Sequence, residues 1–305
     1  MISYKVWSNR PKHFRRLTGI TLEEFDELLD KFQSSYQFFI QREFLSKERR
    51  RAYGGGRRTR IHSLEDKLLF ILVYVRIYPL EFMQGAMFNM AESRSCEWIH
   101  RLLPILDEAM NFTHMKPKRG RGRNLEEILR DFPELAELGI FTDGTERFVR
   151  RPKDKDKQKS KYSGKKKRHS VKNIVITHPT NNTVIFLGKT QDGKVHDKTC
   201  MEYEGIKCRD PIKMLTDLGF LGFKNGKMQV FMPKRKPKGG SLSVNEKSVN
   251  RAISSVRVRV EHAIAGVKRN RSVLDICRNT KEETPDLLMS IACGLHNLRV
   301  AHRYC

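Results

Sequence analysis

Three acidic residues stand at positions where their side chains could share metal ions, in the order Asp143, Asp217 and Glu261. Each aspartate follows a short apolar run that is typical of a β-strand, and side chains at strand ends converge at a sheet edge. Glu261 lies in a segment whose periodicity predicts a long helix. Three carboxylates repel one another unless cations lie between them, and oxygen ligands favour Mg²⁺ or Mn²⁺. Two such ions about 3.5–4 Å apart can activate a water or a 3′-hydroxyl and stabilise the leaving oxygen of a phosphodiester.

Two basic residues flank Glu261 on the same predicted helix. At about 100° per residue, Arg257 lies about 40° and Lys268 about 20° from Glu261 around the helix axis. One face therefore carries all three, and the two cations would hold phosphates beside the metal ions. The alternative is that Asp143 and Asp217 cap strands and that Glu261 pairs with Arg257 one turn away. The order of two strand-end acids and one helical acid favours the metal site.

The charge of the chain points to a polyanionic partner. Its 305 residues include 60 Lys and Arg against 35 Asp and Glu, a net charge of +25. Such an excess favours nucleic acid, and the alternative is a surface kept soluble by charge. The basic residues gather in Gly- and Pro-spaced segments that suit a phosphate backbone better than base edges. These segments are Arg49–Arg60, Lys116–Arg123, Arg147–Lys172 and Lys234–Lys238. We predict DNA contacts at Arg119, Arg121, Lys165, Lys166, Lys167 and Arg168.

Several classes of protein are disfavoured by the sequence. No apolar run reaches the ~18 residues that span a bilayer, and Met1–Pro11 has no signal-peptide core. The six cysteines form no CxxC pair, which disfavours disulfide and zinc-ribbon frameworks and fits a reduced interior. We expect a globular protein of the bacterial cytoplasm or nucleoid, or of the nucleus if the host is a eukaryote.

Residues 1–115 predict a helical region. Thr21–Glu24 and Ser63–Asp66 are N-cap signatures before apolar residues at helical spacing, and Pro79 is expected to end the second helix. Two further helices, Glu81–Met90 and Ser93–Ala109, could form a helix-turn-helix whose second helix enters the major groove. An ordinary helical hairpin is the alternative, and periodicity alone does not decide between them.

A second region of different character follows Lys116–Arg123, which we expect to be a flexible hinge. Three strands come first and strands then alternate with helices, which implies a mixed sheet covered by helices. The predicted strands are Gly139–Thr142, Ser170–Thr177, Thr183–Lys189, Ile212–Thr216 and Met228–Met232, and the predicted helices are His196–Tyr203, Val244–Asn270 and Pro285–Tyr304.

Two further acids receive structural interpretations. His196 and Asp197 could serve a metal or base role, but the favoured interpretation is that one of them starts the helix after the third strand, with Asp197 in its first turn. Glu146 is expected on the opposite strand face from Asp143, because an odd offset reverses the side-chain direction.

Five stretches together resemble the DDE transposases of bacterial insertion sequences, in the IS-five group, which is related to eukaryotic PIF/Harbinger nucleases. Residues 64–106 resemble the helix-turn-helix segment that precedes the nuclease in these proteins, so the likeness covers nearly the whole chain. The five stretches are Phe141–Glu146, Tyr162–His169, Asp192–Asp197, Leu215–Gly222 and the series Arg257, Glu261 and Lys268.

The resemblance implies a ribonuclease-H-like fold, a divalent-metal site, and DNA cleavage and transfer at the ends of a mobile element. It places Asp143, Asp217 and Glu261 at the metal-ligand positions and Arg257 and Lys268 at basic helix positions near the DNA ends. Two positions depart from the expected pattern: Ser254 stands where relatives often carry Tyr, and Ala91 where Ser or Thr would cap the recognition helix better.

We therefore predict an α+β protein with an N-terminal, helix-turn-helix-like region and a ribonuclease-H-like mixed five-stranded sheet with flanking helices. The expected divisions are 1–115 for DNA-end binding, 116–135 for a basic linker and helix, and 136–305 for catalysis. The hypothesis is a transposase that uses two Mg²⁺ or Mn²⁺ ions and acts on double-stranded DNA as a homodimer or higher oligomer. The alternatives are a DDE-fold endonuclease without strand transfer and an inert, sequence-specific DNA-binding descendant.

Overall fold

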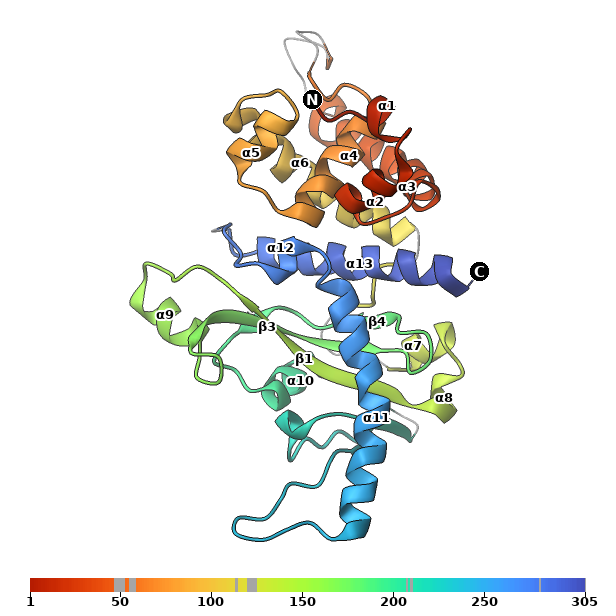
Figure 1. Ribbon diagram of the computed structural model, residues 1–305, viewed down its shortest axis with the longest axis vertical. Coiled ribbons are helices and arrows are strands. Elements are labelled where there is room, and N and C mark those ends of the chain that lie inside the picture. Colours follow the sequence, from red (N-terminus) through yellow and green to blue (C-terminus); the bar gives the residue numbers. More distant parts are fainter. Residues whose placement is uncertain are drawn as a thin grey trace.

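The computed structural model shows a bundle of helices stacked on a layer that contains a β-sheet, with the C-terminal helix between them (Figure 1). None of the described helices is long and apolar enough to cross a membrane. The structure describes residues 1–46, 53–54, 59–112, 115–119, 125–206, 208, 211–279 and 281–304.

The N-terminal bundle forms around a helix that is buried on nearly every side. Its helices are α1 (Tyr4–Trp7), α2 (Pro11–Thr18), α3 (Leu22–Ile40), the π-helix η1 (Gln41–Leu45), α4 (Leu64–Ile77), α5 (Glu81–Met87) and α6 (Glu92–Phe112). Residues 67–75 of α4 are all buried, which explains the longest apolar run of the sequence.

The predicted helix starts of the bundle are confirmed. The Glu24 N–H donates to Thr21 Oγ1 (3.2 Å) while the Thr21 N–H donates to the Glu24 carboxylate (2.7 Å), which is a reciprocal capping box. Ser63 accepts from the Asp66 N–H at 3.1 Å. Helix α4 ends at Ile77, and its C-cap Tyr78, directly before Pro79, has a left-handed φ of 53°. These local signals position the bundle independently of distant contacts.

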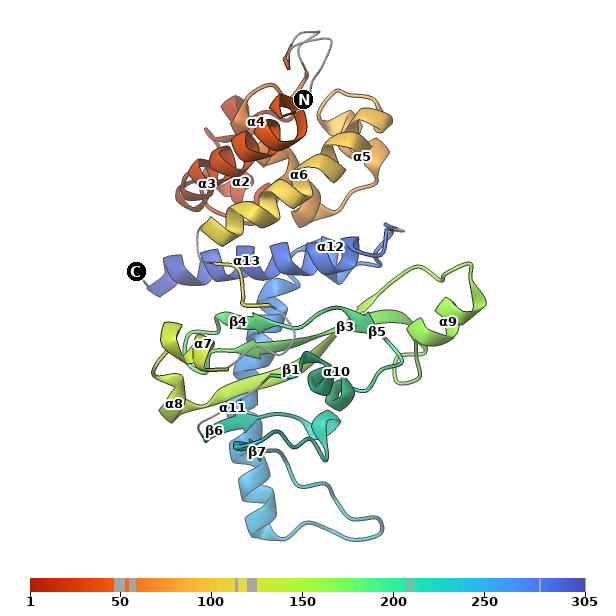
Figure 2. The same ribbon diagram turned by 180° about the vertical axis from the view of Figure 1, so that it is seen from behind.

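The C-terminal helix α13 (Thr284–Tyr304) joins the bundle to the sheet. One continuous apolar core contains Leu288, Ile291 and Leu298 of α13, side chains of the bundle, and Val175 and Leu187 of the sheet. Figure 2 shows α13 lying between the two layers from the other side. The last helix of the chain therefore packs against both parts of the molecule.

The sheet is mixed, as predicted. Strands β1 (Ile140–Phe148), β3 (Arg168–Thr177) and β4 (Val184–Leu187) are antiparallel, and β6 (Ile212–Leu215) and β7 (Met228–Phe231) run parallel to β1. The central order is β4-β3-β1-β6-β7, which has the ribonuclease-H-like arrangement. Two short strands, β2 (Tyr162–Ser163) and β5 (Gln191–Asp192), add to the free edge of β3.

Helices cover both faces of the sheet. The eight-residue α10 (Asp197–Glu204) and the long α11 (Val244–Val267) lie on opposite faces, as the two views show (Figures 1 and 2). The other elements are α7 (Leu125–Asp131), α8 (Leu135–Leu138), α9 (Lys155–Lys161), the 3-10 helix η2 (Leu218–Phe220) and α12 (Arg271–Leu274). Helix α9 forms inside the Lys-rich segment, where no helix was predicted.

The first strand is longer than predicted. It was expected to stop at Thr142, but β1 continues through Asp143 to Phe148, because β3 pairs with it from Phe141 to Phe148. On its other edge, β1 pairs with β6 only at Ile140 and Phe141. The far half of β1 therefore has one open edge.

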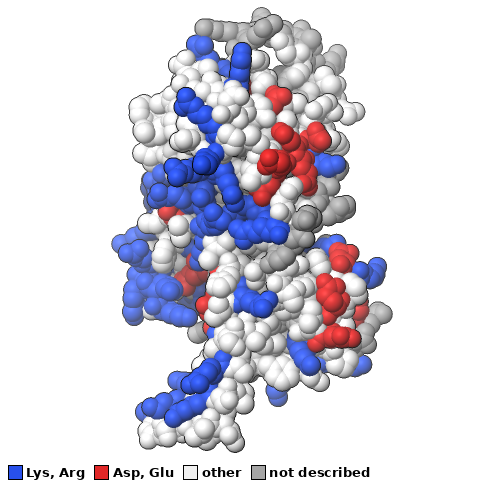
Figure 3. All heavy atoms as spheres, turned by 45° about the vertical axis from the view of Figure 1, so that its right-hand side comes forward, with Lys and Arg blue, Asp and Glu red and all other residues white. Residues whose placement is uncertain are grey.

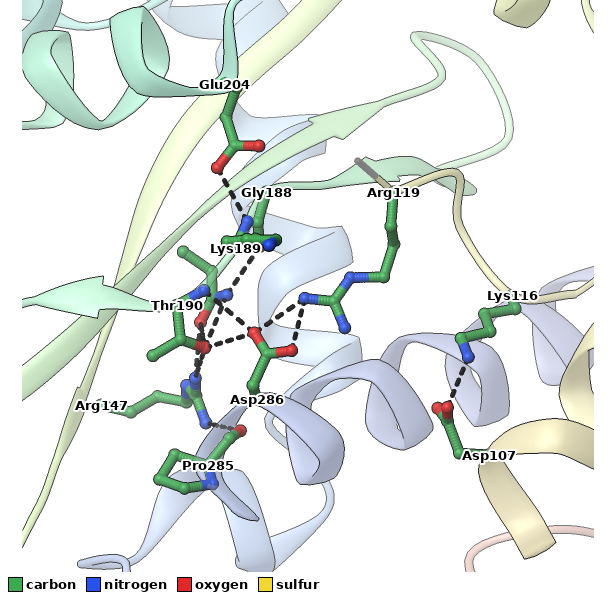
Figure 4. A network of polar contacts seen from close by, with 11 residues as sticks. Asp107, Lys116, Arg119, Arg147, Gly188, Lys189, Thr190, Glu204, Pro285 and Asp286 are labelled. Atoms are coloured by element: carbon green, nitrogen blue, oxygen red, sulfur yellow. Dashed lines mark hydrogen bonds and ion pairs between the residues drawn. The ribbon is translucent and has the colours of Figure 1, made fainter. Parts of the chain in front are cut away.

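The expected hinge at Lys116–Arg123 is wrong for its described residues. Lys118 bridges to the sheet, donating to Ile185 O (2.9 Å) and accepting from Leu187 N (3.0 Å). Lys116 pairs with Asp107 of α6, and Arg119 pairs with Asp286 of α13 at 2.7 Å (Figure 4). These contacts fix residues 116–119 to three elements. Gly120–Arg123, which includes the predicted DNA contact Arg121, lies outside the described residues, as do Arg49–Arg51, Arg57 and Arg58.

Candidate active site

A cleft of about 470 Å³ opens at the free edge of β1, where α10 and α11 approach from opposite faces. Residues of β1 form one wall, and residues of α11 form another. Carboxylates and cations gather along the same cleft. The carboxylates belong to Asp143, Glu146, Asp197, Asp217 and Glu261, and the cations to Lys165, Lys166, Lys172, Arg257 and Lys268.

The sheet places Asp143 and Asp217 side by side. The parallel pairing of β1 and β6 ends at Phe141 and Leu215, and each aspartate stands two residues beyond that pair. Asp143 accepts a hydrogen bond from the Gly144 N–H (2.8 Å), and Asp217 accepts one from the Gly219 N–H (2.8 Å) as it caps η2. The strands thus fix both carboxylates at one point of the cleft.

The environment of Asp143 disfavours its negative charge. Burial, followed by the charge of Asp217, raises its pKa from 3.8 to about 6, and Asp197 contributes in the same direction. Arg257 and the Gly144 N–H act in the opposite sense without cancelling this effect. Burial and like charge are the two general causes of a raised carboxyl pKa. A bound cation would relieve both.

Helix α11 brings Glu261, Arg257 and Lys268 to the cleft, in the line that the helical spacing predicts. The pair between Arg257 Nη2 and Glu261 Oε1 also exists, at 3.7 Å, and the Glu261 side chain is 59% exposed. Arg257 Nε is buried and has no hydrogen-bond partner among the described residues. Lys268 Nζ donates to Glu146 O at 3.1 Å. Glu261 therefore lines the cleft with a largely exposed carboxylate, and Arg257 keeps a free donor.

The predicted basic turn between β2 and β3 lies at the cleft mouth. Lys165 and Lys166 line the cleft, and Lys167 and Arg168 are exposed beside them. The Arg168 guanidinium lies over the ring of Phe148, 5.3 Å from its centroid. This arrangement presents four cations to the solvent next to the acidic residues.

Three charged residues of the cleft, Asp197, Lys172 and Glu146, were not predicted as site residues. Asp197 is the first residue of α10, as expected, but its carboxylate also lines the cleft and pairs with Lys172 Nζ at 3.3 Å. Glu146 alternates on β1 relative to Asp143, but the open strand edge lets one cleft reach both. A sequence signal for Asp197 existed, because it ends the Asp192–Asp197 stretch that carries part of the family resemblance.

Arg119 lies elsewhere, in a polar network between the sheet and α13 (Figure 4). Its guanidinium donates to Asp286, which also accepts from Thr190 N (2.9 Å) and Thr190 Oγ1 (2.7 Å). Arg147 donates to Pro285 O at 2.6 Å and to Asn173 Oδ1 in the same network. Asp286 thus holds Arg119 against α13, and a contact of this arginine with DNA stays a prediction.

A separate group of possible metal ligands lies in the bundle. Glu81, Cys96 and His100 place one ligand atom each within 4.8 Å of one another. Cys96 and His100 are one turn apart on α6, and Glu81 begins α5. These helices are distant from the cleft in both ribbon views, so the group is distinct from the acidic site.

Basic side chains also gather outside the cleft. Figure 3 shows Lys and Arg in a band where the bundle meets the sheet layer, and again at the projecting end of the molecule. The projecting loop before α11 carries Lys234, Arg235, Lys236 and Lys238, all exposed. At the junction, burial and the charge of Arg269 lower the pKa of Arg76. The surface therefore offers contacts for a polyanion at the cleft, at the junction of the two layers and at the projecting loop.

Comparison with known proteins matches both parts of the chain. Residues 142–297 match the family described as DDE superfamily endonuclease, and residues 59–112 match the helix-turn-helix of the same superfamily. The second match favours the helix-turn-helix interpretation of α5 and α6. A curated protein named "Probable transposase for insertion sequence element IS702", from Microchaete diplosiphon, is 25% identical over 293 residues, 95% of each chain. No solved structure matches the chain.

Proposed function

Because this chain belongs to the DDE superfamily endonucleases, we propose that it is a transposase that cuts and joins DNA strands at the ends of an insertion sequence. The similar IS702 protein bears the name of a transposase and matches nearly the full length. The observation that supports the proposal most is the cleft that Asp143 of β1, Asp217 before η2 and Glu261 of α11 all line.

The acids of the cleft fit a divalent metal. Asp143 and Asp217 supply hard oxygen donors, which Mg²⁺ and Mn²⁺ prefer. The raised pKa of Asp143 reflects burial and the repulsion between the two carboxylates, which a bound cation would reduce. We propose that Asp143, Asp217 and Glu261 hold two Mg²⁺ or Mn²⁺ ions. Bound there, the ions would supply activation of a water or 3′-hydroxyl and stabilisation of the leaving oxygen.

The protein's own groups would position the DNA. Arg257, with its free buried Nε, and Lys268 would hold the phosphates that flank the scissile bond. Lys165, Lys166, Lys167 and Arg168 would bind the backbone at the cleft mouth. Catalysis of phosphodiester chemistry depends mainly on such positioning and charge stabilisation, so no protein nucleophile is required.

The remaining parts of the chain receive roles consistent with this chemistry. We propose that residues 1–115 bind the element ends through the helix-turn-helix, that 116–135 connect, and that 136–305 catalyse. Two ends must be cut together, so we propose at least a homodimer on DNA. Such a protein acts where its DNA is, in the nucleoid of a bacterium or the nucleus of a eukaryote.

The test is cleavage of DNA that carries the gene's own flanking sequences, with Mg²⁺ or Mn²⁺. Wild type is compared with Asp143→Asn and with Asp192→Asn, whose carboxylate pairs with Lys161 outside the cleft lining. We expect metal-dependent cuts at repeat boundaries and joined products from wild type and Asp192→Asn only. Cuts without joining would indicate an endonuclease, and binding without cuts in any variant would indicate an inert DNA-binding protein.

A further inference from the structure

A fourth carboxylate, that of Asp197, lies against the glycines that stand beside Asp143 and Asp217. A Cβ built on Gly144 would lie 2.8 Å from Asp197 Cγ, and one built on Gly219 would lie 2.9 Å from Asp197 Oδ2. Neither glycine has a positive φ. Their lack of a side chain is therefore needed for space, and the space at both positions is taken by the same carboxylate.

The two glycines belong to the two acidic motifs. Gly144 directly follows Asp143, and Gly219 donates its N–H to Asp217 Oδ1 at 2.8 Å. A Cβ on Gly219 would also lie 2.8 Å from Asp217 Oδ1, so the Asp197 and Asp217 carboxylates approach the same small volume. Asp143, Asp197 and Asp217 thus converge from β1, α10 and the turn after β6.

A lysine holds the Asp197 side chain in this place. Lys172 Nζ lies 3.3 Å from Asp197 Oδ1 and donates to Val195 O at 3.0 Å. The Lys172 side chain is only 11% exposed, because it extends from β3 into the cleft. The N-cap residue of α10 is His196, and Asp197 is the first helical residue. The Lys172 contact therefore directs the Asp197 carboxylate to the cleft, which it lines.

We propose that Asp197 is a further ligand of the divalent cation held at Asp143 and Asp217, with Lys172 as the residue that positions it. This inference rests on the proposed metal-dependent function. It gives the cation oxygen donors from both sides of the sheet, since Asp197 enters from the α10 face and Glu261 from the α11 face.

The test measures Mn²⁺ binding to the full chain without DNA, by electron paramagnetic resonance or calorimetry. Asp197→Asn is compared with Asp192→Asn, a matched change that also removes one carboxylate and one ion pair with lysine. We expect Asp197→Asn and Asp143→Asn each to weaken Mn²⁺ binding about tenfold or more, and Asp192→Asn to leave it unchanged. Unchanged binding by folded Asp197→Asn, with a lower thermal midpoint, would overturn the inference in favour of a helix-start role.

The control with Asp143→Asn separates this inference from the proposed function. If wild type binds no Mn²⁺, or binds it equally after Asp143→Asn, the proposed metal site itself fails. If Asp143→Asn weakens binding and Asp197→Asn does not, only the role of Asp197 fails.

A second measurement uses the wild type and does not depend on the folding of a variant. Fe²⁺ bound in place of the cation generates hydroxyl radicals with peroxide and ascorbate, which cut the nearby main chain. We expect cuts at residues 143–144, 217–219 and 196–198. Cuts at the first two places without the third would contradict ligation by Asp197.

Discussion

Two polar clusters are built into the same sheet, and they differ in how their charges are satisfied. In the network beneath α13, Asp286 accepts hydrogen bonds from Arg119 and Thr190. Burial alone would raise its pKa, but these donors hold it below the usual value. In the cleft, Asp143 accepts one hydrogen bond among the described residues, and its pKa rises to about 6.

The difference separates structure from function. A buried carboxylate with its own cation and donors needs no further ligand, and removing a partner leaves an uncompensated charge. The carboxylates of the cleft instead repel one another, and a bound metal ion would reduce this repulsion. The α13 network should therefore matter for folding, and the cleft should matter for chemistry at little cost or even some gain in stability.

The largest expected effect of this contrast is on cleavage. Asp217→Asn should lower the rate of DNA cleavage roughly a thousandfold or more, about 4 kcal/mol of transition-state stabilisation, because it removes an anionic metal ligand. DNA affinity should stay equal or rise, since one negative charge near the phosphates is lost. Cleavage in Mg²⁺ and binding by fluorescence anisotropy are the measurements. Retained cleavage would remove Asp217 from the site.

The α13 network should show the reverse behaviour. Asp286→Ala removes the ion pair with Arg119 and the hydrogen bonds from Thr190, so we expect the free energy of unfolding to fall by roughly 2–3 kcal/mol. Urea unfolding measures the loss, with Asp217→Asn as the control that should not be destabilised. Equal losses in both variants would contradict the distinction between the two clusters.

The pH dependence of stability sharpens the comparison further. Asp143 binds its proton more tightly in the folded state (pKa about 6) than its ordinary value of 3.8. Between about pH 4 and 6 the folded state thus holds more protons, and its stability falls as pH rises. Relative to Asp143→Asn, wild type should lose up to about 3 kcal/mol over this range, less where solvent screens the charges. Urea unfolding at several pH values without metal measures this, and parallel curves would contradict it.

Local patterns were enough to predict much of the molecule. The N-caps at Thr21 and Ser63 depend on residues within one turn, and the mixed sheet followed from the alternation of apolar strands and helices. The adjacency of Asp143 and Asp217 needed only that both stand shortly after the paired residues of neighbouring strands. The helical spacing of Arg257, Glu261 and Lys268 likewise placed them on one face.

The features that were missed depend on contacts between distant segments. Strand β1 continues past Thr142 because β3 pairs with it, and no local pattern contains that partner. Asp197 reaches the cleft because β6 stops short and leaves the edge of β1 open. The expected hinge was wrong because Asp286, more than 160 residues away in sequence, holds Arg119. A run of basic residues indicates a polyanionic partner, but it does not show which of these residues form ion pairs within the protein.

The smallest expected effect concerns the cations at the cleft mouth. Lys165→Gln with Lys166→Gln should flatten the dependence of log binding constant on log salt by about 0.9 for each lost phosphate contact, because fewer counterions are released. Lys224→Gln with Lys227→Gln is the matched control, since both lysines are exposed and lie outside the cleft lining. Binding to the element-end DNA is measured across a salt series.

The control gives this last measurement its meaning. If both pairs flatten the slope equally, the effect comes from the net charge of +25 rather than from the cleft. If neither does, Lys165 and Lys166 are solvated, and the DNA passes the acidic residues by another path. A change confined to Lys165 and Lys166 would place the phosphate backbone beside Asp143. The protein's own groups do not balance the carboxylate charges there, whereas they do in the α13 network.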